Sequence, residues 1–279
     1  MSVLRRSPGR EVRGQLVVIT GGARGIGRCA ADLFSREGAR VVIGDRDLPV
    51  AEATAAELGR DIRALPLDVS SSDSWRTFVH AIEEPIDVLI NNAGVMPLGA
   101  VLKEPEEVAR VIFDINVHGP INGIKTVAPG MVERGRGHIV NVSSAVGRVP
   151  TAGGATYSAS KHALVGFSDS VRMELEPHGV DVSMVLPSIV KTELAAGIDT
   201  DGPAPAVTPE EVAEVILDVV RRPVAEAWVP RWTQGLTKGT NLLPRSMQAA
   251  MTKAFKADRV LQDLDESARA AYEDRARRR

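Results

Sequence analysis

Short apolar runs recur along the chain and alternate with longer segments whose apolar residues have helical spacing. The runs are rich in β-branched residues and contain few polar positions, which is typical of strands buried on both faces. The pattern predicts strands at 15–20, 40–44, 62–67, 86–90, 138–142 and 180–186, and helices at 50–58, 74–82, 104–118 and 156–176. Alternation of strand and helix predicts an α/β fold, a doubly wound parallel sheet of about seven strands with helices on both faces.

Glycines follow the first predicted strand directly. Gly21, Gly25 and Gly27 lie between this strand and a segment with helical spacing. Glycine lets a backbone approach a pyrophosphate, and a helix N-terminus offers free N–H groups and a positive dipole end. The turn, including Arg24 and Ile26, is therefore predicted to bind the phosphates of a dinucleotide. The spacing Gly-x-x-x-Gly-x-Gly differs from the better known fingerprint, and glycines alone also occur in any tight turn.

A carboxylate ends the second predicted strand. Asp45 is placed to accept hydrogen bonds from the hydroxyls of an adenosine ribose. It would repel a 2′-phosphate by roughly 1–4 kcal/mol per charge pair. Arg24 and Arg46 argue the other way, because either could meet a phosphate. We expect Asp45 to outweigh them and predict NAD over NADP; the alternative is a turn aspartate that caps the next helix.

The next two predicted strands also end in polar or small residues. Asp68, followed by Val69, is available to an adenine amino group, but it serves equally well to cap the helix after Ser70. The residues 91–94, Asn-Asn-Ala-Gly, suit a backbone that lies close under a bound ligand.

Tyr157 and Lys161 are four residues apart in a predicted helix, so their side chains lie one above the other. Ser144 follows the strand at 138–142. The end of this strand and the helix would therefore bring all three side chains together at the opening of one site. The alternative is that Tyr157 is an ordinary half-buried aromatic residue and Lys161 a solvated charge.

Six signals occur in one order, and together they resemble the short-chain dehydrogenase/reductase family. They are Thr20-Gly21-x-x-x-Gly25-Ile26-Gly27, Asn91-Asn92-Ala93-Gly94, Asn116, Ser144, Tyr157-x-x-x-Lys161 and Pro187-x-x-Val190-x-Thr192. The resemblance covers residues 12–230 and implies a Rossmann-type domain that uses NAD or NADP. Ser188 stands where the family usually has glycine, which restricts the backbone near the nicotinamide.

The chemistry of these residues agrees with the resemblance. Removal of a hydride from an alcohol leaves a proton, and tyrosine accepts it well only if its pKa falls from about 10 toward 7, which requires roughly 4 kcal/mol. Lys161 and the positive nicotinamide ring are suitable sources of that stabilisation. Ser144 can hydrogen-bond the substrate oxygen. The resemblance implies further that Lys161 binds the nicotinamide ribose and that Asn116 orients a water in a proton relay.

The predicted site therefore has two overlapping sets of residues. The catalytic set is Asn116, Ser144, Tyr157 and Lys161. The set that contacts NAD is Gly21, Arg24, Gly25, Ile26, Gly27, Asp45, Arg46, Asp68, Val69, Asn92, Ala93, Gly94, Tyr157, Lys161, Pro187, Val190 and Thr192. The histidines lack ligand spacing, so we predict no catalytic metal, and His162 is expected to face away from Lys161.

Composition narrows the setting. The net charge of -2, with both signs interspersed, argues against a nucleic-acid partner. The single cysteine, Cys29, fits a reducing cytosol as a structural thiol. The arginine-containing N-terminus lacks the apolar segment of a secretory signal, and no run of eighteen apolar residues could span a membrane. A cytoplasmic protein is expected.

Three parts are predicted: an arm at 1–11, one dinucleotide-binding catalytic domain at 12–230 and a helical extension at 231–279. Residues 193–207 predict a mobile lid, and a helix at 209–222 with Thr208 as N-cap and a last strand at 225–229 follow. Two apolar helical stripes lie beyond, the first at Leu243, Met247, Ala250, Met251, Ala254 and Phe255, the second at Val260, Leu261, Leu264, Ala268, Ala271 and Tyr272. They either cover the domain or a subunit neighbour, or form an apolar lip for a lipophilic substrate that touches a membrane surface.

The sequence thus predicts an NAD-dependent oxidoreductase that interconverts a secondary alcohol and its ketone, with a hydrophobic, steroid- or lipid-like substrate preferred. The alternatives are an NADP-dependent carbonyl reductase, a sugar-nucleotide epimerase, which the glycine spacing opposes, and a non-catalytic NAD-binding regulatory or assembly subunit. The family resemblance implies a homotetramer or homodimer through the helices that carry Asn116 and Tyr157.

Overall fold

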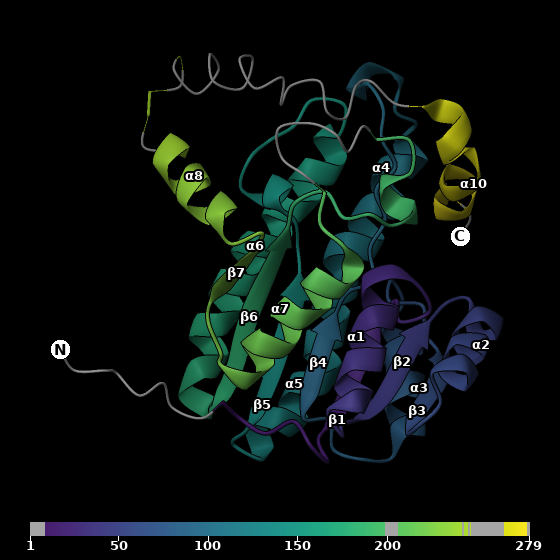
Figure 1. The fold of residues 1–279 in the computed structure, drawn as a ribbon, viewed down its shortest axis with the longest axis vertical. Coiled ribbons are helices and arrows are strands. Elements are labelled where there is room, and N and C mark those ends of the chain that lie inside the picture. The colour runs from purple at the N-terminus through teal and green to yellow at the C-terminus, as the bar shows by residue number, and fades with distance from the viewer. Residues whose placement is uncertain (1–8, 199–205, 242, 245, 247–264, 278–279) are drawn as a thin grey trace.

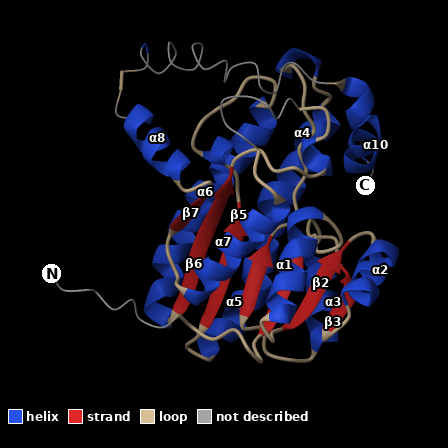
Figure 2. Cartoon of the chain, viewed as in Figure 1, coloured by secondary structure: helices blue, strands red, loops and turns tan. Residues whose placement is uncertain are grey.

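The computed structural model describes residues 9–198, 206–241, 243–244, 246 and 265–277. They form a parallel seven-stranded sheet with the order β3-β2-β1-β4-β5-β6-β7 (Figures 1 and 2). The strands are β1 Leu16–Thr20, β2 Arg40–Asp45, β3 Ile62–Pro66, β4 Val88–Asn91, β5 Gly137–Val142, β6 Val180–Pro187 and β7 Glu226–Val229. The predicted doubly wound parallel sheet is confirmed, with strand bounds within two residues of those expected.

Helices cover both faces of the sheet. Their bounds are α1 Gly25–Arg36, α2 Leu48–Leu58, α3 Ser72–Ile82, α4 Glu106–Phe113, α5 Gly119–Glu133, α6 Ala155–Leu175, α7 Pro209–Arg221, α8 Trp232–Asn241 and α10 Glu266–Arg277. Alternate residues of β1 point to opposite faces: Val17 and Ile19 pack with α1, α2 and α7, whereas Leu16 and Val18 pack with α3, α5 and α6. The absence of polar alternation in the apolar runs follows from this double coverage.

The direction of winding reverses between β1 and β4. The chain first builds β1, β2 and β3 outward to one side and then returns, so that β4 pairs with the other side of β1. The helices leaving these two strands cover opposite faces, which opens a crevice at their carboxyl ends. All predicted site segments that follow strands lie along this edge.

One predicted helix boundary is wrong. The helix expected at 104–118 is divided: α4 ends at Phe113, a π-helical turn spans Asp114–His118, and α5 continues to Glu133. Pro120 lies in the first turn of α5, where proline is tolerated. A Cβ on Gly119 would lie 2.9 Å from Val69 Cγ2, so glycine here allows close packing rather than a helix end.

The helix expected at 209–222 and the last strand expected at 225–229 are confirmed, and the mobile lid stays a prediction. Thr208 and Glu211 form a capping box on α7, and β7 is the last strand. The helix α8 was not predicted. Residues 1–8 of the arm, 199–205 of the expected lid, most of the first apolar stripe and 260–264 of the second lie outside the described residues, and the division into three parts stays a prediction. Among the helices described, none has the length and apolarity needed to cross a bilayer.

A buried histidine makes the stability depend on pH. His138 in β5 is 3% exposed, and its Nε2 lies 2.9 Å from Ser183 Oγ in β6. Burial lowers the pKa of His138 to about 4 from 6.5, with Asp181 opposing and Arg10 adding to the shift. Between these values the unfolded chain binds the proton and the folded protein does not, so stability is lost as the pH falls.

We therefore expect the free energy of unfolding to fall by roughly 3 kcal/mol between pH 7 and pH 4 through this residue alone. His138→Gln should flatten the pH dependence measured by urea unfolding, whereas the exposed His178→Gln should retain the parent slope. Equal slopes for all three proteins would refute the assignment.

Candidate active site

The glycine turn after β1 is packed too closely for side chains. Gly21 and Gly25 have φ of +65° and +53°, a region that favours glycine. A Cβ on Gly27 would lie 2.2 Å from Gly21 O and 2.7 Å from Asn92 Nδ2. Arg24 is the N-cap residue of α1, and no described side chain caps the helix, so its first N–H groups are available to an anion. The turn thus fits the phosphates of a dinucleotide.

Asn92 fastens this turn to the end of β4. Its Nδ2 donates to Thr20 O at 2.9 Å and to Gly21 O at 3.2 Å. The Thr20 hydroxyl in turn accepts hydrogen bonds from the backbone N–H groups of Asn92 and Ala93, each at 3.0 Å. Asn92 and Ala93 therefore shape the floor of the crevice through their positions, and the Asn92 amide nitrogen is engaged by backbone.

Asp45 lies against the glycine turn, as its predicted role requires. Its Oδ2 accepts a hydrogen bond from Ala23 N at 3.2 Å and its Oδ1 one from Asp47 N at 3.1 Å. A carboxylate has about four acceptor positions, so both oxygens can accept further hydrogen bonds from ribose hydroxyls. Arg24 pairs with Asp47 at 2.8 Å, and Arg46 donates to the Arg275 carbonyl at 3.4 Å. Both arginines that could have met a 2′-phosphate have other partners.

Asp68 serves the turn that follows it. Its Oδ1 accepts hydrogen bonds from Ser70 N at 2.9 Å and Ser70 Oγ at 2.6 Å, and Ser71 caps α3. This geometry supports the capping alternative, whereas contact of Asp68 and Val69 with an adenine stays a prediction.

Tyr157 and Lys161 lie side by side in the interior. Both come from α6, and their exposed fractions are 7% and 5%. Lys161 Nζ lies 5.8 Å from the centroid of the Tyr157 ring and donates to Val142 O, at the end of β5, at 3.2 Å. The alternative of a half-buried tyrosine beside a solvated lysine is therefore wrong.

Burial moves both pKa values away from their ordinary range. It raises the pKa of Tyr157 to about 12, against the opposing effect of a hydrogen bond with Ser144. It lowers the pKa of Lys161 to about 8. At neutral pH the lysine is still mostly an ammonium, and the tyrosine of the protein alone is a phenol.

Ser144 stands at the carboxyl end of β5, next to the end of β6. It is buried, its Oγ accepts a hydrogen bond from Val146 N at 3.3 Å and donates to Pro187 O at 3.4 Å. Both bonds are long, so they can give way to a substrate oxygen at small cost.

The hydrogen bonds of Asn116 account for a polar side chain inside a helical segment. It lies in the π-helical turn, where its Nδ2 donates to Val95 O at 2.9 Å and its Oδ1 accepts from Val95 N at 2.8 Å. The amide thereby holds the backbone that follows β4. A Cβ on Gly94 would lie 3.2 Å from Asn116 Oδ1 and 3.6 Å from Lys161 Nζ, so these three residues meet. The water-orienting role stays a prediction.

The loop after β6 completes the crevice opposite the glycine turn. Thr192 Cγ2 would lie 3.2 Å from a Cβ on Gly25, and Val190 forms an isolated parallel bridge with Val207. Ser188 Oγ is buried and has no hydrogen-bond partner among the described residues. A buried hydroxyl without a partner in the loop after β6 is compatible with a polar ligand such as a nicotinamide dinucleotide at this edge of the sheet.

The sequence predicted a helical stripe where α10 lies but missed the polar contacts that this helix makes at this edge. Tyr272 was included in an apolar stripe, but its hydroxyl accepts a hydrogen bond from Met96 N at 2.6 Å, beside the predicted site. Arg269 was not singled out at all, although its side chain is 2% exposed. The available signal was an arginine three and seven residues before Tyr272 and Ala276, and so on the same helical face, because charges on apolar faces usually have buried partners.

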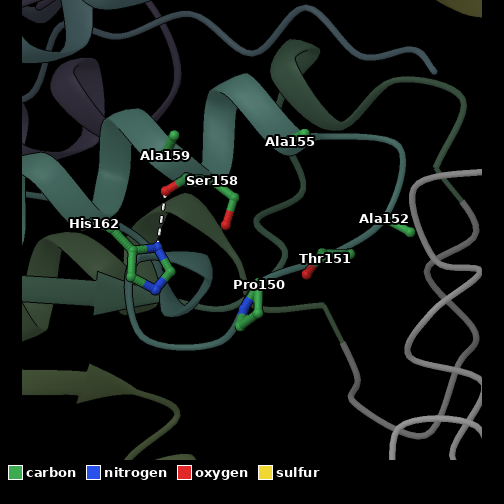
Figure 3. Close-up of a pocket in the computed structure, with 7 residues that line it drawn as sticks. All are labelled: Pro150, Thr151, Ala152, Ala155, Ser158, Ala159 and His162. Carbon is green, nitrogen blue, oxygen red and sulfur yellow. Dashed lines mark hydrogen bonds between the residues drawn. The ribbon is translucent and has the colours of Figure 1, made fainter. Parts of the chain in front are cut away.

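Two further groups do not contribute to the predicted catalytic set. His162 helps to line an open surface pocket of about 440 Å³, shown in Figure 3, to which neither Tyr157 nor Lys161 contributes. Cys29 donates to Glu210 at 3.2 Å, and burial raises its pKa to about 11, so it is a thiol rather than a nucleophile. Within the described part of the chain no cluster of three metal-ligating side chains is present.

Comparison with known proteins decides the family. The family model for short chain dehydrogenase matches residues 15–202. The chain belongs to this family. It is therefore an oxidoreductase that acts on CH–OH groups with NAD(P), and the matched region contains every predicted catalytic residue.

Individual relatives agree with the assignment. The chain is 33% identical to dehydrogenase/reductase SDR family member 7B of Xenopus tropicalis, over 77% of this chain and 77% of that protein. It is 38% identical to a sorbitol dehydrogenase of Cereibacter sphaeroides, over 67% and 74%. A short-chain dehydrogenase/reductase from Burkholderia phymatum, solved in complex with NAD, has the same fold with a TM-score of 0.75 at 23% identity, over 82% and 93%.

The close packing of Gly27 leads to a test of the phosphate turn. Gly27→Ala should lower the free energy of unfolding by several kcal/mol, on the order of an overpacked core site, because the added methyl meets backbone. It should also weaken NAD binding by more than tenfold, measured by calorimetry. Gly235→Ala in α8, where the methyl would meet nothing within 4 Å, is the control and should change neither quantity much. Normal stability and NAD affinity in Gly27→Ala would contradict the packing argument.

Proposed function

We propose that the protein interconverts a secondary alcohol and its ketone with NAD, and that Tyr157 moves the proton. The observation that carries this proposal is the buried pair of Tyr157 and Lys161 beside Ser144, across the crevice from an uncapped glycine turn. A buried ammonium beside a phenol is an arrangement that stabilises the phenolate form. Proton transfer and cofactor binding would then occur at one sheet edge.

The residues at this edge divide the work of holding the cofactor. The turn from Gly21 to Gly27 and the N-terminus of α1 would hold the phosphates, Asp45 the adenosine ribose, and Lys161 the nicotinamide ribose. When bound, oxidised NAD supplies the hydride acceptor and a positive ring charge. The Ser188 hydroxyl and the backbone near Val190 and Thr192 would line the same end of the crevice and orient the nicotinamide ring.

Tyr157 would accept the hydroxyl proton of the alcohol while a hydride passes from the carbinol carbon to oxidised NAD. The Ser144 hydroxyl donates a hydrogen bond to the substrate oxygen and keeps it close to the phenol. To act near neutral pH, Tyr157 needs its pKa lowered from about 12 toward 7. Five units correspond to about 7 kcal/mol of preferential phenolate stabilisation, which two adjacent positive charges in an interior can provide.

The opposite direction uses the same residue in its neutral form. Without a positive ring charge nearby, Tyr157 keeps its proton and can donate it to a ketone oxygen. Lys161, whose pKa of about 8 leaves it mostly charged at neutral pH, then stabilises the negative charge that remains on the phenol oxygen. A tyrosine suits both directions, because its high intrinsic pKa keeps the proton on for ketone reduction and a nearby positive charge removes it for alcohol oxidation.

An apolar lining supports a hydrophobic substrate. Tyr157 packs in one cluster with Met96, Ala195 and Ile198, joined by Leu98, Val146, Ile189 and Leu194. Some relatives carry names of polyol enzymes, such as sorbitol and galactitol 2-dehydrogenase. The lining here favours instead a secondary alcohol with an apolar body, such as a steroid- or lipid-like compound. A homo-oligomer remains our expectation from the family resemblance, and a cytoplasmic location remains our expectation from the composition.

Tyr157→Phe tests the proton-transfer role. It removes the hydroxyl and keeps the ring, so we expect kcat for alcohol oxidation to fall by roughly 10³-fold or more, while the NAD dissociation constant stays within threefold. NADH absorbance measures turnover, and calorimetry measures NAD binding. Turnover within tenfold of the parent would remove Tyr157 from the mechanism.

Asp45→Asn tests the choice of cofactor. Loss of the carboxylate charge removes the repulsion of a 2′-phosphate, so the ratio of kcat/KM for NAD over NADP should fall by about tenfold or more. Asp61→Asn, an exposed carboxylate at the opposite edge of the sheet, is the matched control and should leave the ratio unchanged. An unchanged ratio in Asp45→Asn, or a parent that prefers NADP, would favour the carbonyl reductase alternative.

A further inference from the structure

A buried arginine on α10 joins the two loops that flank the catalytic tyrosine. Arg269 Nη1 donates to Leu194 O and to Ala196 O, both at 2.9 Å, and its Nη2 donates to Met96 O at 2.7 Å. Met96 belongs to the loop after β4, and Leu194 and Ala196 belong to the loop after β6. One side chain, 2% exposed, therefore bridges segments separated by about a hundred residues of sequence.

The remaining donors of this arginine are also engaged. Arg269 Nε and Nη2 each lie 3.2 Å from Glu273 Oε1, one helical turn later. The same carboxylate oxygen accepts a hydrogen bond from Leu98 N at 3.3 Å. A guanidinium has five N–H groups, and all five have partners here. Arg269 can bind an anionic substrate only by giving up one of them, so its role is to position backbone.

Tyr272 adds a second contact on the same face of α10. Its hydroxyl accepts from Met96 N at 2.6 Å, and its ring lies 5.2 Å from the Arg269 guanidinium carbon. Tyr272 is 7% exposed and close enough to Tyr157 for a phenolate there to disfavour its own ionisation. Both polar groups of the Met96 backbone are thus held by α10, its N–H by Tyr272 and its C=O by Arg269.

The start of α10 is docked to the loop after β6. Asp265 N donates to Gly197 O at 3.0 Å, and Asp265 Oδ1 caps the helix through Ser267 N and Ala268 N. Gly197 has φ of +72°, and a Cβ there would lie 2.5 Å from Asp265 O. The helix and the loop therefore meet backbone to backbone, which requires glycine at this position.

These contacts hold the apolar walls around Tyr157. Tyr157 packs with Met96, Ala195 and Ile198. The backbone of Met96 is bonded directly to α10, and Ala195 and Ile198 are next in sequence to residues whose carbonyls accept hydrogen bonds from Arg269 or Asp265. In Figure 1, α10 lies beyond the carboxyl ends of the strands, near α4. The helix α10 of the C-terminal extension thus covers the domain beside the candidate site.

We propose that α10 is a latch that fixes the size of the substrate pocket, with Arg269 as a positioning residue and Tyr272 as a specificity-determining residue. The latch holds the loops after β4 and β6 at one separation, so the pocket admits an apolar secondary alcohol only up to the length that this separation allows. This inference rests on the proposed alcohol dehydrogenase function.

The first test needs no activity. Arg269→Lys keeps the positive charge but cannot bridge three carbonyls, so amide hydrogen exchange should rise at least tenfold in peptides that cover 95–98 and 194–198. Arg275→Lys, on the same helix, keeps the exposed ion pair with Glu193 and should exchange like the parent. Parent-like exchange in Arg269→Lys would overturn the latch.

The second test measures selectivity along a series of secondary alcohols of increasing chain length. Tyr272→Ala should raise the ratio of kcat/KM for long over short alcohols at least tenfold, and Tyr272→Phe, which keeps the ring, should stay within threefold of the parent ratio. Arg269→Lys should raise the KM for the alcohol at least tenfold with the KM for NAD within twofold.

The outcomes separate this inference from the proposed function. An equal loss for all alcohols, at the same melting temperature, would overturn the role in specificity while leaving the dehydrogenase function intact. A parent protein that oxidises no alcohol with NAD would contradict the proposed function and the specificity role together, and the exchange experiment would still decide whether α10 holds the two loops.

Discussion

The Lys161 ammonium is a charge held in the protein interior, and the surrounding elements supply it with a hydrogen-bond acceptor and with space. Burial without partners would drive the proton off, because desolvation disfavours the charged form. The Val142 carbonyl at the end of β5 accepts one hydrogen bond, and the absence of a side chain on Gly94 leaves room close to Nζ. Asn116 fixes the backbone beside Gly94. The ends of β4 and β5, the π-helical turn and α6 are therefore coupled through one charged group.

The same low-polarity interior governs Tyr157. Burial keeps its proton on when the protein is alone, since no described group beside it fully offsets the loss of water. A site of this kind does not carry a permanent phenolate that would bind stray cations or react. Under the proposed function its acidity depends on added positive charge, so proton transfer would be coupled to the oxidation state of the bound dinucleotide. The apolar cluster around Tyr157 would serve this function in two ways, because it excludes water from the phenol and offers an apolar surface to the body of the proposed substrate.

The sequence predicted those parts of the fold and site that depend on local pattern. Apolar runs located β1 to β6, and the spacing of Gly21, Gly25 and Gly27 located the tight glycine turn between β1 and α1. Asn116 stood out as a polar residue inside a predicted helix, but the π-helical turn and its bonds to Val95 were not foreseen, because propensities describe regular helices. Arg269 was missed because its partners, Met96, Leu194 and Ala196, are distant in sequence, and only folding brings them within reach. Local patterns thus predict elements, whereas long-range polar bonds require the structure.

Titration of Tyr157 tests the account most directly. The chain has two tyrosines, Tyr157 and Tyr272, so tyrosinate absorbance of the Tyr272→Phe variant reports Tyr157 alone. The protein by itself should show a pKa of about 12 for Tyr157. With saturating oxidised NAD the pKa should fall by at least two units, roughly 3 kcal/mol of phenolate stabilisation, and with NADH the fall should be much smaller. A Tyr157 pKa that oxidised NAD leaves unchanged would contradict the proposed coupling between the cofactor and the proton-transfer residue.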